Sequence, residues 1–84
     1  MSKEIYMARN LSDIDTTEIC YLRYDGIWYI YFPHCGLANL SNHKVEEHED
    51  GTLTVQPSIL VNGHNNGNPT QRHGYLTRGV WNEC

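Results

Sequence analysis

The chain has 84 residues, enough for one small hydrophobic core and too few for a second domain. Six Lys and Arg stand against ten Asp and Glu, for a formal net charge of -4, and this balance excludes nucleic acid as a partner because such binding depends on clustered basic side chains. No apolar run approaches the length of a membrane span and no signal peptide is present, so we expect no membrane partner and a cytoplasmic location. Six Tyr and two Trp favour strands over a helical bundle.

The first seventeen residues carry the least clear pattern. Ile5 and Met7 fit a short edge strand, and Ser12 fits the cap of a single helical turn that runs to Thr16. We therefore expect one β domain over 1–84, in which 1–17 is a loosely packed N-terminal segment.

The clearest hairpin pattern lies at 18–32. Two runs rich in Tyr and Ile, 18–24 and 27–32, flank Asp25-Gly26. An Asp-Gly pair between such runs predicts a two-residue turn, because both positions tolerate positive φ. The second run has almost no polar residue, which predicts a central strand covered on both faces.

Two further hairpins follow from the same pattern. In the first of them, the arms 44–49 and 52–56 flank the turn Asp50-Gly51. In the second, the arms 73–77 and 80–84 flank the turn Arg78-Gly79. The charged first arm at 44–49 is typical of an edge strand. Three hairpins in so short a chain predict an all-β, mostly antiparallel fold with little helix, arranged as a small meander or a zinc-ribbon-like sheet.

Between the last two hairpins, 57–61 is a predicted short strand. The segment 62–71 that follows is rich in Gly, Asn and Pro. Such a composition predicts an exposed loop that is available for contact with a partner.

The cysteines suggest a metal site. An odd count of three, with no export signal, predicts thiols that stay free or bind metal. Cys20 falls within a strand and is interpreted as a core residue. Cys35 belongs to the turn Phe32-Pro33-His34-Cys35-Gly36, which resembles the knuckle that presents thiolates in zinc ribbons.

Pairing about Arg78-Gly79 places Thr77 opposite Val80 and so brings His73 opposite Cys84. Opposed residues have Cβ atoms about 4.5 to 5.5 Å apart, a separation that suits two ligands of one metal. We therefore predict a structural Zn²⁺ site whose ligands are Cys35, His73, Cys84 and, as the fourth, His34, with His43 or His64 as substitutes. One alternative is a three-ligand site with an open position. Another is that Cys35 is simply a buried residue and His73 and Cys84 are surface residues.

Three motifs of the chain resemble a family of small phage and prophage proteins of unknown function. These motifs are Phe32 to Gly36, Thr54 to Val61 and Arg72 to Cys84. Members of that family typically show a Cys-Pro-x-Cys-Gly knuckle, a Thr-x-x-Pro-Ser stretch and a final Cys-His strand that leads to a late Cys. The resemblance implies zinc coordination and a phage-encoded origin. This chain has Phe32 and Arg72 where the family has cysteines, so either His34 and His73 replace those ligands or this chain has lost the metal.

The leading functional hypothesis is a phage-encoded accessory protein that binds a host or phage protein in the host cytoplasm. The small size, the acidic surface and the missing active-site motifs favour it. The alternative is a virion structural or decoration subunit whose free strand edge adds to a neighbouring sheet. A second alternative is a zinc-dependent hydrolase with Glu83 or Glu47 as general base. The oligomeric state is left open, with a homo-oligomer among the arrangements the sequence allows.

Overall fold

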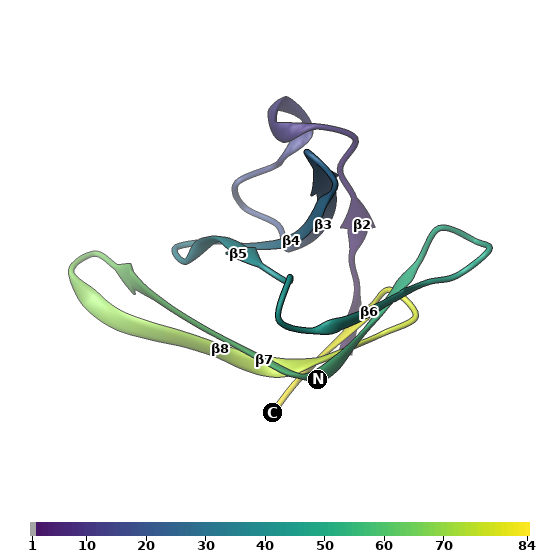
Figure 1. Ribbon diagram of the computed structural model, residues 1–84. Helices are drawn as coiled ribbons and strands as arrows, with labels where there is room; N and C mark the ends of the chain where they lie inside the picture. The colour runs from purple at the N-terminus through teal and green to yellow at the C-terminus, as the bar shows by residue number, and fades with distance from the viewer. Residues whose placement is uncertain (1) are drawn as a thin grey trace.

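Two β-sheets account for most of residues 2–84, which are the residues described by the computed structural model (Figure 1). The first sheet has the order β1-β9-β8-β7-β6 and the second the order β2-β3-β4-β5. The strands are β1 Ser2–Glu4, β2 Tyr6–Met7, β3 Cys20–Tyr24, β4 Ile27–Phe32, β5 Gly36–Asn39, β6 Lys44–Glu47, β7 Leu53–Asn65, β8 Asn68–Thr77 and β9 Val80–Glu83. The prediction of an all-β, mostly antiparallel fold with little helix is confirmed, and the strands form two sheets where one had been expected. Within residues 2–84 no helix is long and apolar enough to cross a membrane.

The first and third predicted hairpins form with the expected turns. Tyr24 pairs with Ile27 in the β3–β4 hairpin, and Thr77 pairs with Val80 in the β8–β9 hairpin. All four turn residues have positive φ, as a two-residue turn of this hand requires: Asp25 at 53°, Gly26 at 78°, Arg78 at 47° and Gly79 at 76°. The turn chemistry therefore fixed the register of both hairpins.

The second hairpin pairs as expected but turns over a longer loop. Glu47 pairs with Leu53, and the His48 N–H donates to the Thr52 carbonyl at 2.8 Å. The loop therefore contains three residues, 49–51, and the predicted two-residue turn at Asp50-Gly51 is wrong. The reason is that Gly51, at φ 84°, takes the left-handed position that closes a three-residue hairpin loop.

The predicted loop 62–71 is also corrected, because this segment continues β7 and β8 around a tight turn. The turn is Asn66-Gly67, with φ values of 52° and 81°, and Asn65 pairs with Asn68 across it. An Asn-Gly pair is a strong hairpin signal, but the Gly- and Asn-rich composition around it led to the prediction of a loop. Figure 1 shows the resulting β7–β8 ribbon extending well past the other strands.

The N-terminal segment pairs with both sheets. β1 pairs with β9 and β2 runs parallel to β3, while Ile5 between them is buried and its N–H donates to the Gly79 carbonyl at 2.9 Å. The predicted helical turn at 12–16 is replaced by a 3-10 helix at Leu11–Asp13. Met1, the first residue of the predicted domain 1–84, lies outside the described residues.

The main core lies between the two sheets. Its buried members are Ile5, Ile19, Tyr21, Ile30, Phe32, Leu40, Leu53, Val55, Ile59, Leu76 and Trp81. A smaller cluster of Ala8, Cys20 and Leu22 packs with Tyr29 and Tyr31. Because strand residues alternate between faces, this second cluster covers the other face of β4, as the apolar sequence of that strand predicted. Cys20 is fully buried, in agreement with its interpretation as a core residue.

Candidate functional site

Cys35 lies in the turn between β4 and β5, and it packs against the main core. Its N–H donates to the Phe32 carbonyl at 3.1 Å, and His34 adopts φ 67°. The turn rests directly on β7, since a Cβ at Gly63 would overlap the His34 carbonyl oxygen and lie 2.9 Å from the Cys35 Sγ. Cys35 is therefore held on the core side of the first sheet.

His73 and Cys84 lie on the outer face of the same sheet. Gly74 and Leu76 of β8 are buried, so alternation places His73 on the opposite side, and His73 is exposed. The predicted pairing with Cys84 is present, because the Cys84 N–H donates to the His73 carbonyl at 2.8 Å. Cys84 is exposed as well.

The four predicted zinc ligands consequently do not converge. Cys35 faces the core, His73 and Cys84 face outward, and His34 is exposed in the β4–β5 turn. Within residues 2–84 no three His, Cys, Asp or Glu side chains come together in a group that could hold a metal ion. The predicted set does not fit one tetrahedral site within a single chain, and structural zinc binding stays a prediction.

The two substitute histidines lie elsewhere. His43 is half-buried, with Nε2 3.3 Å from the Ser58 carbonyl oxygen, and His64 is exposed on β7. The His73 Nε2 lies 3.2 Å from the Ser58 Oγ. Ser58 thus contacts two of the histidines, an arrangement that no sequence spacing indicated.

Phe32 and Arg72, the two positions where the chain departs from the cysteines of the resembled family, contact each other. The Arg72 guanidinium carbon lies 5.3 Å from the centre of the Phe32 ring. Arg72 also donates to Glu83, with Nη2 2.7 Å from Oε1 and Nε 3.2 Å from both carboxylate oxygens. The Trp81 Nε1 donates to the same carboxylate at 2.8 Å, and the Phe32 and Trp81 rings pack edge to face at 4.9 Å. We call these four residues the Arg72 cluster.

The Arg72 cluster joins the two sheets, because Phe32 ends β4 while the other three members lie on β8 and β9. Hydrogen bonds from Arg72, and a further one from Trp81, hold the pKa of Glu83 below its ordinary value. Glu83 is therefore ionised at neutral pH and committed to a structural ion pair. This position does not suit the role of general base that the hydrolase alternative gave it.

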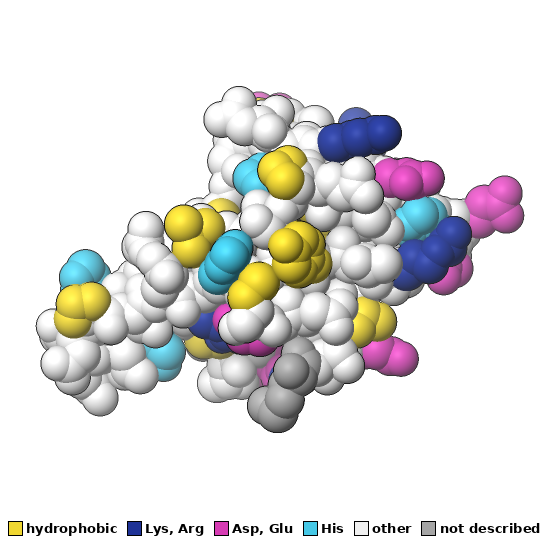
Figure 2. Space-filling model, turned by 90° about the horizontal axis from the view of Figure 1, so that it is seen from below, with side chains coloured by type: hydrophobic (Ala, Val, Ile, Leu, Met, Phe, Trp, Pro, Cys, Tyr) yellow, Lys and Arg dark blue, Asp and Glu magenta, His cyan; other side chains and the backbone are white. Residues whose placement is uncertain are grey.

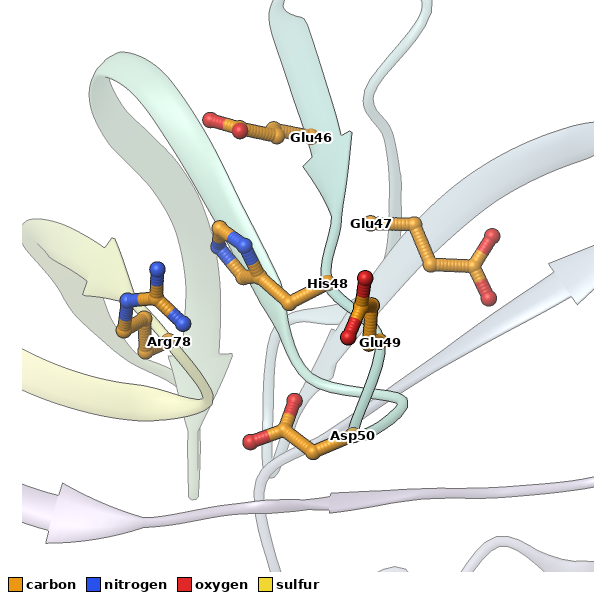
Figure 3. A pocket seen from close by; sticks show the side chains of 6 residues that line it. All are labelled: Glu46, Glu47, His48, Glu49, Asp50 and Arg78. Carbon is orange, nitrogen blue, oxygen red and sulfur yellow. The ribbon is translucent and has the colours of Figure 1, made fainter.

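A second feature, an acidic cavity of about 500 Å³, lies beside the tip of the β6–β7 hairpin (Figure 3). It is lined by Glu46, Glu47, His48, Glu49, Asp50 and Arg78. Figure 3 shows Asp50 and His48 directed toward the side on which Arg78 lies, whereas the Glu47 carboxylate points away from Arg78. The lining of the cavity thus carries four carboxylates and a single guanidinium.

Hydrogen bonds fix the floor and rim of this acidic cavity. The Thr54 hydroxyl accepts the backbone N–H of Arg78 at 3.0 Å and lies 2.7 Å from the His48 Nε2, which links two hairpins. Thr52 donates its N–H and hydroxyl to Asp50 Oδ1 at 3.0 and 2.6 Å. These bonds, helped by the nearby His48 and Arg78, lower the pKa of Asp50, so the cavity keeps its negative charge at neutral pH.

Comparison of the chain with protein-family models, curated proteins and solved structures finds no match. The resemblance to a phage family therefore stays a prediction that rests on three motifs. Function has to be inferred from the geometry of the residues themselves.

Proposed function

We propose that this chain is a phage-encoded accessory protein that acts in the host cytoplasm by binding a host or phage protein. The contact would be made by the free edge of β6 together with the acidic cavity beside it. The phage origin is supported by the resemblance of three motifs, and the mode of binding is supported by the two observations below.

The first observation is that β6 ends its sheet. Within residues 2–84 only β7 pairs with it, over Lys44 to Glu47. Because His48 hydrogen-bonds back to β7, the alternation of antiparallel pairing turns the backbone N–H and C=O groups of Val45 and Glu47 outward. Unpaired backbone groups of this kind are a template on which an extended segment can add as a further strand.

The second observation is the charge next to this edge. Four carboxylates and one guanidinium line the acidic cavity, in a chain whose formal net charge is already -4. Electrostatic complementarity favours a partner segment that is extended and carries Lys or Arg. Such a segment would pair its backbone with β6 while its basic side chains enter the acidic cavity, and this combination carries the proposal.

The test is a charge reversal in the acidic cavity, Glu46→Lys with Glu49→Lys. A tagged form of the chain is first used to capture partners from host cells. The affinity of each identified partner for the wild type and for the variant is then measured with purified proteins. We expect the double variant to weaken binding by about 10-fold or more. The matched control, Glu4→Lys with Asp13→Lys, changes the net charge equally but far from β6 in the sequence and should bind as the wild type does. Equal binding by variant and control would remove the proposal.

A virion subunit is the second candidate, and the β7–β8 ribbon is the observation that favours it. β6 covers β7 only from Leu53 to Gln56, so the stretch from Pro57 to Asn65 has no further strand on that side within the described residues. The His64 N–H on this edge already donates to the His34 carbonyl at 3.1 Å, so a neighbouring subunit could add a strand along Pro57 to Gly63. Mass spectrometry of purified phage particles separates the two candidates, because abundant peptides from this chain are expected only of a virion subunit.

A further inference from the structure

The outer face of the first sheet carries an uncharged, partly apolar surface. Its members, which we call the outer patch, are Ser58, Leu60, His73, Tyr75, Asn82 and Cys84. Leu60 is 56% exposed and Tyr75 is 51% exposed, both large values for apolar or aromatic side chains. Figure 2 views this side of the molecule and shows hydrophobic and His side chains near its middle, with most charged side chains toward the right.

Three residues of the outer patch form one row across the sheet. Leu60 of β7 is the Cα partner of His73 in β8, and the Cys84 N–H donates to the His73 carbonyl at 2.8 Å. Directly opposed residues place their side chains on the same face, so the imidazole and the thiol are neighbours. These are the two ligand types that Zn²⁺ prefers.

Ser58 is placed to orient the imidazole of His73 as a metal ligand. Its Oγ lies 3.2 Å from the His73 Nε2. In the tautomer that donates from Nε2 to this hydroxyl, Nδ1 keeps its lone pair for a metal. Histidines that bind zinc are commonly held by an outer hydrogen bond of this kind, which fixes the ring and its tautomer.

One chain supplies only half of a tetrahedral site, since within residues 2–84 no third ligand joins this pair. A second copy related by a twofold axis presents the same two ligands from the same patch. We propose that Zn²⁺ bridges two copies of this chain through His73 and Cys84 of each, forming a Cys₂His₂ site between their outer patches. Each thiol gives its proton to solvent as it binds the metal.

The rest of the outer patch suits a second copy of this chain better than a charged partner. Contact between the two patches would bury Leu60 and Tyr75 of both chains. Two copies that each carry a formal charge of -4 repel one another least where no charged side chain lies at the contact. The proposal is independent of the acidic cavity, which lies on the β6–β7 and β8–β9 turns.

The test measures the mass of the full chain in solution, in reducing buffer, with chelator and then with ZnCl₂ alone. We expect 9.7 kDa with chelator and twice that mass once one Zn²⁺ is present for every two chains. Co²⁺ should give the near-ultraviolet thiolate band and the visible bands of a tetrahedral site. Cys84→Ser and His73→Gln should each abolish the change in mass, and Ser58→Ala should weaken zinc affinity by about 10-fold.

Matched controls use the ligand types that lie elsewhere. Cys35→Ser and His34→Gln, both in the β4–β5 turn, should dimerise with zinc as the wild type does, and the Glu46→Lys, Glu49→Lys variant should do so too. Equal melting temperatures in chelator show that the exposed substitutions leave the fold intact. The proposal is overturned if zinc leaves the wild-type mass at 9.7 kDa, if Cys84→Ser still dimerises, or if the dimer forms only on oxidation.

Discussion

The Glu83 carboxylate accepts hydrogen bonds from side chains of two different strands, Arg72 on β8 and Trp81 on β9. These bonds favour the ionised form and lower the pKa of Glu83 in the folded chain. A carboxyl group with a lowered folded pKa stabilises the fold above its unfolded pKa, about 4.3 for Glu. This stabilisation is lost as the pH falls through the folded value. The ion pair is half-buried, so it should contribute more than a fully exposed pair does.

We predict that Glu83→Gln lowers the free energy of unfolding by roughly 1 to 2 kcal/mol at about pH 7, because Arg72 loses its charged acceptor. The variant should also lose less stability than the wild type when the pH is lowered to about 3. Urea unfolding at both pH values measures the effect, with the exposed Glu49→Gln as the control. Identical pH dependence in wild type and Glu83→Gln would contradict the role assigned to this ion pair.

Gly63 marks the closest approach between the β4–β5 turn and β7. A Cβ at this position would overlap the His34 carbonyl oxygen and lie 2.6 Å from the Cys35 Cα, and both are backbone atoms that cannot rotate away. We predict that Gly63→Ala destabilises the chain by more than about 2 kcal/mol, since the turn must move off the ribbon. The melting temperatures of the variant and the wild type measure this loss of stability. Equal melting temperatures would mean that the β4–β5 turn can shift without cost.

At the scale of elements, the β7–β8 ribbon depends on its turn. Asn66 and Gly67 both take left-handed backbone conformations, and the ribbon beyond Pro57 lacks support from β6. β7 also advances four positions between Val55 and Ile59 while β8 advances two between Leu76 and Gly74, so a bulge separates the part of the ribbon that β6 covers from the rest. Beyond Gly63, which contacts the β4–β5 turn, only the tip of the ribbon is free of such packing. The distal ribbon should therefore open without unfolding the core.

We predict that Gly67→Ala weakens this distal ribbon by about 1 kcal/mol, through the cost of a positive φ. No atom lies within 4 Å of the added Cβ, so steric overlap adds nothing. Faster amide exchange should be confined to the tip of the ribbon, residues 64–69, beyond the contact of Gly63 with the β4–β5 turn. Asn66→Gly, which accepts the same backbone conformation, serves as the control and should leave exchange close to that of the wild type. Faster exchange throughout the main core would contradict a local role.

At the scale of the whole molecule, both sheets contribute to one core. Phe32 of the second sheet is fully buried and contacts Trp81 and Arg72 of the first sheet. Since neither sheet has a separate core of comparable size, the two should unfold together. An 84-residue chain has a small free energy of unfolding, so one large cavity in this shared core should destabilise both sheets.

We predict that Phe32→Ala lowers the free energy of unfolding by about 3 to 5 kcal/mol, because it leaves a cavity and removes the ring beneath Arg72. Leu37→Ala, at a 44% exposed position on β5, should change it by less than about 0.5 kcal/mol. In the wild type, Trp fluorescence and circular dichroism should report one coincident urea transition. Separate transitions would mean that the sheets fold independently.

The sequence by itself determined the hairpins about Asp25-Gly26 and Arg78-Gly79 and the pairing of His73 with Cys84. Each of these follows from a turn, and a turn depends on the backbone freedom of one or two residues and on the alternation of their neighbours. The same local rule would have found the Asn66-Gly67 hairpin, had the composition of that segment not been interpreted as a loop.

Only the tertiary structure decided which residues meet across the molecule. It divided the strands between two sheets, turned Cys35 toward the core and His73 outward, and placed Arg78 beside carboxylates that lie some thirty residues earlier in the chain. It also brought Phe32 and Arg72 into contact. The physical reason is that these contacts depend on how distant strands share one core, a property that neither turn chemistry nor strand alternation carries.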